Sequence, residues 1–74
     1  MNSTNLLMLP LWLKYPEILP GSIGWRMGDG EDYWFEWHDW FRAQDRDFRA
    51  AYVARYPEPT GWERLYECTT RGLE

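Results

Sequence analysis

The stretch Gly30–Ala43 reads GEDYWFEWHDWFRA and decides how the chain folds. Its aromatic residues recur at intervals of three and four, the spacing of one face of an α-helix. Acidic residues lie at the start of the stretch, where they complement the positive end of a helix dipole. The apolar arc is formed by Tyr33, Trp34, Phe35, Trp37, Trp40 and Phe41. We therefore expect a helix over about residues 31–43 that is contacted on more than one side.

A second helix is predicted over about residues 45–56. Asp45 has the chemistry of an N-cap, and Pro57 prevents the helix from continuing. The expected inner face consists of Phe48, Ala51, Tyr52 and Tyr56. The same residues could also continue the first helix without a break. We prefer two helices because Asp45 and Asp47 favour a helix start over a helix interior.

A third, shorter helix is predicted over about residues 61–68. Pro57 and Pro59 form a rigid bend before it, and Thr60 and Glu63 match the spacing of a capping box. Its inward residues would be Trp62, Leu65 and Tyr66. Residues 69–74 are expected to form a frayed tail.

The first 29 residues predict an extended arm, because their prolines and glycines oppose a long helix. The apolar run at residues 6–13 has no polar face and should lie in a groove made by the rest of the chain. Apolar and other residues alternate at 23–27, which indicates a short strand. The expected fold is thus mainly α: one domain spanning residues 1–74, in which the arm packs over a helical part at residues 30–68.

Length and composition exclude several classes of protein. The chain has 74 residues, a net charge of −4 and one cysteine, Cys68. A domain of this length buries only about 60% of its unfolded surface, which opposes a large core and a deep catalytic cleft together. One cysteine excludes an internal disulfide and favours the reducing cytoplasm. The run at 6–13 is short and broken by Pro10, so it predicts neither a signal peptide nor a membrane span.

The residues needed for metal or covalent chemistry are too few. A zinc site needs three or four ligands, whereas this chain offers His38 and Cys68, far apart in sequence. Cys68 lies near the expected frayed end, where catalytic geometry is poorly held. Asp32 and Glu36 are one helical turn apart, but on a surface helix they would be solvated. We therefore expect no metal, no cofactor and no enzymatic activity.

The aromatic content is the unusual feature of the composition. The sequence contains six Trp, five Tyr and three Phe, and each such ring buries roughly 150 to 250 Å² when it is enclosed. A domain of this size lacks the interior for all of them, so some must remain partly exposed. Trp, Tyr and Arg are enriched at binding hot spots. Two interpretations follow: the rings fill the core with only their polar tips in solvent, or they form a recognition surface.

Charge is also segregated along the chain. Residues 29–39 contain five acidic residues and no Lys or Arg, whereas residues 42–55 contain four Arg. An acidic block can pair locally or present a face to a basic partner. We predict a partner-binding set that consists of Trp34, Trp37, Trp40, Glu31, Asp32, Glu36 and Asp39.

The expected function is a non-enzymatic protein-binding module, such as a small bacterial or phage adaptor or inhibitor. One version imitates nucleic-acid charge and blocks a nucleic-acid-binding machine. An alternative is a nucleic-acid or ribonucleoprotein binder, disfavoured by the net negative charge. It would use Arg42, Arg46, Arg49 and Arg55 with Tyr52 and Tyr56 as stacking platforms. A second alternative is a small carbohydrate-binding or enzymatic domain. Another protein is the expected partner, and self-association is compatible with the composition.

Overall fold

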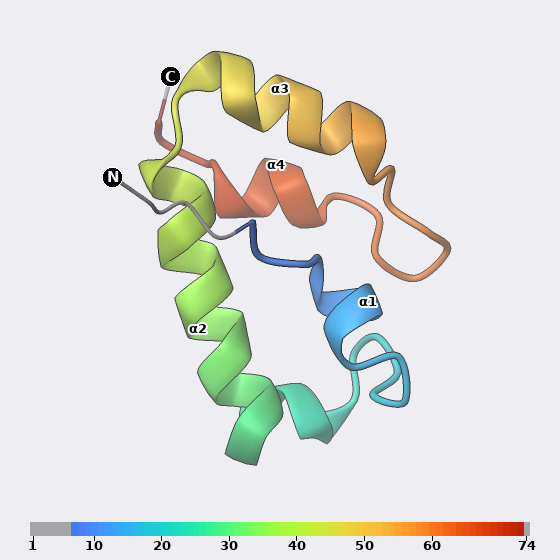
Figure 1. Ribbon diagram of the computed structural model, residues 1–74. Coiled ribbons are helices and arrows are strands. Elements are labelled where there is room, and N and C mark those ends of the chain that lie inside the picture. The colour runs from blue at the N-terminus through green and yellow to red at the C-terminus, as the bar shows by residue number, and fades with distance from the viewer. Residues whose placement is uncertain (1–6, 74) are drawn as a thin grey trace.

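The computed structural model describes residues 7–73, and helices are the only regular elements in this part of the chain. The elements are α1 (Leu11–Lys14), the 3-10 helix η1 (Ile23–Arg26), α2 (Gly28–Ala43), α3 (Arg46–Arg55) and α4 (Leu65–Thr69). Figure 1 shows α2 along one side of the molecule, with α3 running from its C-terminal end. The mainly α fold class is confirmed.

The long aromatic stretch forms α2, and the chain breaks before α3 as expected. α2 begins at Gly28, about one turn earlier than the predicted start, and ends at Ala43. The Asp45 carboxylate then accepts a hydrogen bond from the backbone N–H of Phe48 at 2.8 Å. Because this side-chain cap satisfies a donor of the new helix, two helices form instead of one.

The third helix forms later than its sequence predicts. The Glu63 carboxylate accepts from the Gly61 N–H at 2.9 Å, but α4 begins only at Leu65 because Arg64 adopts a left-handed conformation with φ +72°. The capping-box start at residue 61 was therefore wrong. Trp62, Leu65 and Tyr66 are nevertheless buried, which confirms their inward orientation.

The strand expected at residues 23–27 was also wrong. The Ser22 side chain accepts a hydrogen bond from the Gly24 N–H at 3.0 Å and caps the 3-10 turn η1. Of the alternating apolar residues only Trp25 is buried, while Ile23 and Met27 are largely exposed. No strand exists among residues 7–73 for this segment to pair with, so the backbone satisfies its hydrogen bonds locally.

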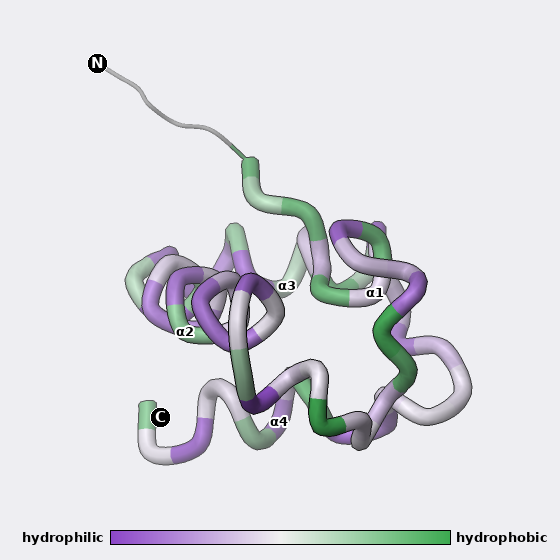
Figure 2. The backbone as a smooth tube through the Cα atoms, turned by 90° about the horizontal axis from the view of Figure 1, so that it is seen from below, coloured by the Kyte–Doolittle hydropathy of each residue, from purple (hydrophilic) through white to green (hydrophobic). Residues whose placement is uncertain are grey.

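The N-terminal arm packs on the helices but is not fully extended, since it contains α1. Tyrosine hydroxyls fix it: Tyr33 donates to the Leu9 carbonyl oxygen and Tyr52 to that of Met8, each at 2.7 Å. Leu11 is completely buried. The hydrophobic segment that leads into α1 is visible in Figure 2. Only part of it lies in a groove, because Leu7, Leu9 and Leu13 stay exposed; Leu6 lies outside the described residues.

The core is built almost entirely from aromatic rings. Trp37 stacks on Phe41 with ring centroids 5.0 Å apart, and both side chains are fully buried. Tyr52 of α3 and Tyr66 of α4 lie against Phe41 at 5.3 and 5.4 Å. We call these four rings the sealed cluster. Its polar atoms are hydrogen-bonded: the Trp37 indole N–H donates to the Tyr52 hydroxyl at 3.1 Å, and the Tyr52 and Tyr66 hydroxyls donate to the carbonyl oxygens of Met8 and Tyr56.

Candidate functional site

A second group of rings reaches the surface at one member, Trp34. The indoles of Trp25, Trp34 and Trp62 are mutual neighbours, with centroids 5.4 to 6.0 Å apart. They come from η1, α2 and the loop before α4, so the tertiary fold alone assembles them. Trp25 and Trp62 are buried, whereas Trp34 is partly exposed.

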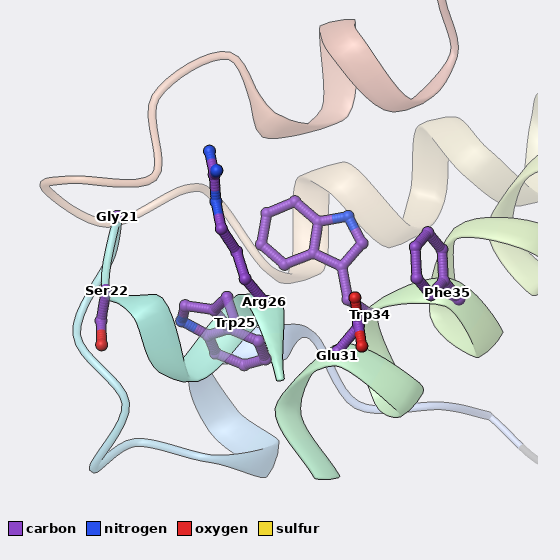
Figure 3. Close-up of a pocket in the computed structure, with 7 residues that line it drawn as sticks. All are labelled: Gly21, Ser22, Trp25, Arg26, Glu31, Trp34 and Phe35. Atoms are coloured by element: carbon purple, nitrogen blue, oxygen red, sulfur yellow. The ribbon is translucent and has the colours of Figure 1, made fainter. Parts of the chain in front are cut away.

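Two hollows flank the Trp34 ring. The first, of about 280 Å³, has walls from Trp25, Trp34 and Phe35 and charged side chains from Arg26 and Glu31. Figure 3 shows the Trp34 ring standing between Arg26 and Phe35.

The second hollow, of about 230 Å³, lies between Trp34, Trp62 and Leu65 and also reaches the only cysteine, Cys68. The two hollows share Gly21 and Trp34. We call them together the indole site. Their shared wall makes Trp34 the residue that any ligand spanning both hollows must contact.

The polar edges of these indoles differ. The Trp25 N–H donates to the Ile18 carbonyl oxygen at 3.3 Å. For the Trp34 N–H no hydrogen bond is found with any residue in the described range 7–73. An indole N–H usually finds an acceptor when it is buried. In Trp34 this donor remains available to a ligand.

The outer face of α2 is acidic. Asp29, Asp32, Glu36 and Asp39 are all exposed, and within residues 7–73 none of them forms an ion pair or side-chain hydrogen bond. Phe35 lies on the same face and is 60% exposed. We call these five residues the acidic face. An exposed aromatic ring beside a stripe of unpaired carboxylates resembles the anchor and polar rim of a binding surface.

The structure separates the three tryptophans of the predicted partner-binding set. Trp34 forms the wall of the indole site, and Glu31 lies at its edge. Trp37 is 0% exposed in the sealed cluster, so it cannot contact a partner of the folded protein. Trp40 is partly buried and packs edge-on against Phe48 at 5.7 Å. The helical spacing placed all three on one arc and could not show which part of the arc the other elements cover.

Sequence reasoning missed several residues of this surface. Trp25, Trp62 and Phe35 were not included in the predicted partner-binding set, yet they lie next to Trp34. No local pattern could have found them, because the segments meet only in the fold: Gly61 lies so close to Pro20 that an added Cβ would be 2.6 Å from the proline ring. That contact brings the segment before α4 toward the loop before η1. The most exposed apolar side chains are aliphatic, Leu19 at 69% and Ile23 at 71%.

The residues of the predicted nucleic-acid face have roles within the fold. Tyr52 is buried and cannot stack on a base. The Arg42 guanidinium donates to the carbonyl oxygens of Thr69 and Arg71 at 2.8 and 3.2 Å. Arg49 donates to the Gln44 carbonyl oxygen.

The remaining members of that face lie along α3. Arg46 is exposed in its first turn. Arg55 lies over the ring of Tyr56 at 5.5 Å. With Tyr52 buried and Arg42 bonded to the C-terminal segment, the six residues do not form one open stacking surface.

Burial changes the titration of the core tyrosines. It raises the pKa of Tyr33 to about 12, against the opposing effect of its hydrogen bond to Leu9. Burial also raises the pKa values of Tyr52 and Tyr66. These hydroxyls are therefore neutral donors at physiological pH and hold backbone carbonyls.

The described residues contain no group of three or more His, Cys, Asp and Glu side chains arranged to hold a metal ion. None of the helices in residues 7–73 has the length and apolar character needed to cross a membrane. Searches of family models, of curated proteins and of solved structures find no match to the chain. The indole site and the acidic face are therefore the features that bear on function.

Proposed function

We propose that this protein is a non-enzymatic protein-binding module that docks on a basic surface of a larger partner. One observation supports this proposal above the others: the acidic face carries four carboxylates without ion-pair partners in the described residues, beside a Phe35 ring that is 60% exposed. Like charges on one helix repel each other, so the face costs stability in the isolated domain. A basic partner would remove that cost and cover Phe35.

Apolar surface next to the acidic face strengthens the proposal. The indole site adjoins it through Phe35 and Glu31, which line the first hollow. Aromatic anchors inside a polar rim are typical of binding interfaces. Complementary charges on the partner would raise the association rate and the selectivity, while the Phe35 anchor would supply affinity. The version in which the face imitates nucleic-acid charge is a special case, with a nucleic-acid-binding protein as the partner.

Local charge removal tests the proposal. The immobilised protein is incubated with a lysate of its source cells at about 50 and about 500 mM NaCl, and retained proteins are identified by mass spectrometry. We expect a partner that is retained at low salt and lost from the double variant Glu36→Gln with Asp39→Asn. Phe35→Ala should weaken retention at both salt concentrations, because its contribution is apolar.

A control variant separates local from total charge. Glu17→Gln with Asp47→Asn removes the same two charges from exposed positions outside the acidic face. It should retain the partner as the unmodified protein does. Equal loss of the partner from both double variants would indicate an effect of net charge. Retention that is unchanged by salt and by substitution of Glu36 and Asp39 would exclude this docking mode.

A further inference from the structure

The second hollow of the indole site has the chemistry of a small-molecule site. We infer that it binds a compact, uncharged, largely apolar ligand whose carbonyl oxygen accepts a hydrogen bond from the Trp62 indole N–H. This inference goes beyond the proposed function, because it concerns a small ligand and makes no use of the acidic face. It is supported by the hydrogen bonding of the buried indoles, by the walls of the hollow and by its charged side chains.

The Trp62 indole differs from the other buried indoles in its hydrogen bonding. In the part of the chain that the structure describes, the buried tryptophans are Trp25, Trp37 and Trp62. The Trp25 N–H donates to the Ile18 carbonyl oxygen, and the Trp37 N–H donates to the Tyr52 hydroxyl. The Trp62 N–H has no acceptor among the described residues, although this residue is only 7% exposed. A buried donor without an acceptor costs stability, and an acceptor on a ligand would remove that cost.

The second hollow gives a ligand access to this ring. Trp62 lines it together with Pro20, Leu65 and Trp34, and the Trp34 N–H likewise has no acceptor among the described residues. An indole nitrogen is a donor only, so both rings favour an acceptor on the ligand. The hollow measures about 230 Å³, below the volume of about 300 Å³ at which pockets for drug-sized ligands begin. It therefore suits a single ring that carries a carbonyl group.

The charged side chains at this hollow favour an uncharged ligand. Its lining includes one acid, Glu63, and one base, Arg64. The Glu63 carboxylate accepts from the Gly61 N–H at 2.9 Å, and the Arg64 guanidinium donates to both carboxylate oxygens of Glu67 at 3.2 and 3.1 Å. Both charges thus have partners within the protein. A charged ligand would lose hydration without gaining a counter-charge, whereas a neutral carbonyl would not.

The probe for this inference is acetophenone, a benzene ring that carries a carbonyl group. The comparison compound is α-methylstyrene, which has the same shape but a CH₂ group in place of the oxygen. NMR follows the indole N–H signals of the isotope-labelled full chain, assigned by single Trp→Phe variants. We expect acetophenone to move the Trp62 indole proton downfield in a saturable way, with a Kd in the millimolar range. α-Methylstyrene should bind roughly tenfold more weakly, because it cannot accept the hydrogen bond.

Matched variants locate the binding. Trp62→Phe keeps a ring but removes the donor, and it should weaken acetophenone binding roughly tenfold, measured through the Trp34 signal. Trp12→Phe is its control, because Trp12 packs against Trp62 at 5.7 Å but does not line the second hollow. Cys68→Phe adds a ring at the wall of the hollow and should block the ligand while the Trp62 donor remains. Cys68→Ala should bind as the unmodified protein does.

Circular dichroism establishes that each variant is folded, and the Cys68 pair decides the question if Trp62→Phe does not fold. An unmoved Trp62 proton, equal shifts with the two compounds, or equal weakening by Trp62→Phe and Trp12→Phe would each overturn the inference. Undiminished binding to Cys68→Phe would place the ligand elsewhere and would also overturn it. None of these results bears on the proposed function, which the dependence of lysate capture on Glu36 and Asp39 tests separately.

Discussion

Gly30 lies where two backbone segments approach too closely for a side chain. A Cβ at this position would lie 2.2 Å from the Gly24 carbonyl oxygen of η1, a backbone atom that cannot move aside. Gly30→Ala should therefore lower the free energy of unfolding by about 1 to 3 kcal/mol, although alanine is the better helix former. Urea unfolding measures the change. Gly24→Ala is the control, because its Cβ would meet only side chains, those of Ile18 at 2.9 Å and Ser22 at 3.5 Å, and should cost less.

Glu58 holds the start of α4 from outside the helix. Its two carboxylate oxygens accept from the backbone N–H groups of Arg64 and Tyr66, at 3.1 and 2.7 Å. Removing the charge in Glu58→Gln should destabilise the protein by about 1 kcal/mol, the usual value of a helix cap. Thermal unfolding measures the loss. Glu67→Gln breaks only the exposed pair with Arg64 and should have little effect; a larger loss from Glu67→Gln would contradict this role of Glu58.

At the scale of elements, the arm is fastened to the helices by buried hydroxyls. The Tyr52 hydroxyl donates to the Met8 carbonyl oxygen and accepts from the Trp37 indole N–H. Tyr52→Phe leaves both groups without a partner and should cost about 1 to 3 kcal/mol. Amide hydrogen exchange should show faster exchange in α1 of the variant. Unchanged exchange would mean that the arm is held by apolar contacts alone.

The elements also show what sequence can and cannot predict here. Asp45 and Pro57 gave the bounds of α3 to within a residue or two because capping and chain stiffness act locally. The start of α4 was predicted wrongly because Glu58 accepts the backbone N–H groups at its beginning, and Glu58 belongs to no recognisable local capping motif. The strand at 23–27 failed for a similar reason, since alternation over five residues contains no information about a pairing strand. Trp34 was predicted as a contact residue, but the rings around it come from distant segments.

At the scale of the whole molecule, alkaline pH should unfold the protein through its tyrosines. Burial raises the pKa of Tyr33 to about 12 in the folded chain, from an ordinary value of 10.0. Below pH 10 the Tyr33 hydroxyl is protonated in both the folded and the unfolded chain, so its full contribution to stability is present. Above pH 10 the Tyr33 hydroxyl loses its proton in the unfolded chain before it does so in the folded one, so stability falls as the pH rises through about 12. Urea unfolding between about pH 8 and pH 12 measures this slope, which Tyr33→Phe should reduce.

The division of the rings into a sealed cluster and an open indole site is the central claim. Trp25, Trp37 and Trp62 are buried, whereas Trp12, Trp34 and Trp40 are partly exposed. Incorporation of fluorinated tryptophan gives one fluorine NMR signal for each indole, assigned by single Trp→Phe variants. A soluble paramagnetic relaxation agent then reports which rings meet solvent.

We predict strong broadening of the Trp34 signal and none of the Trp37 signal. Equal protection of Trp34 and Trp37 would mean that the indoles only fill the interior, and it would contradict a docking surface at the indole site.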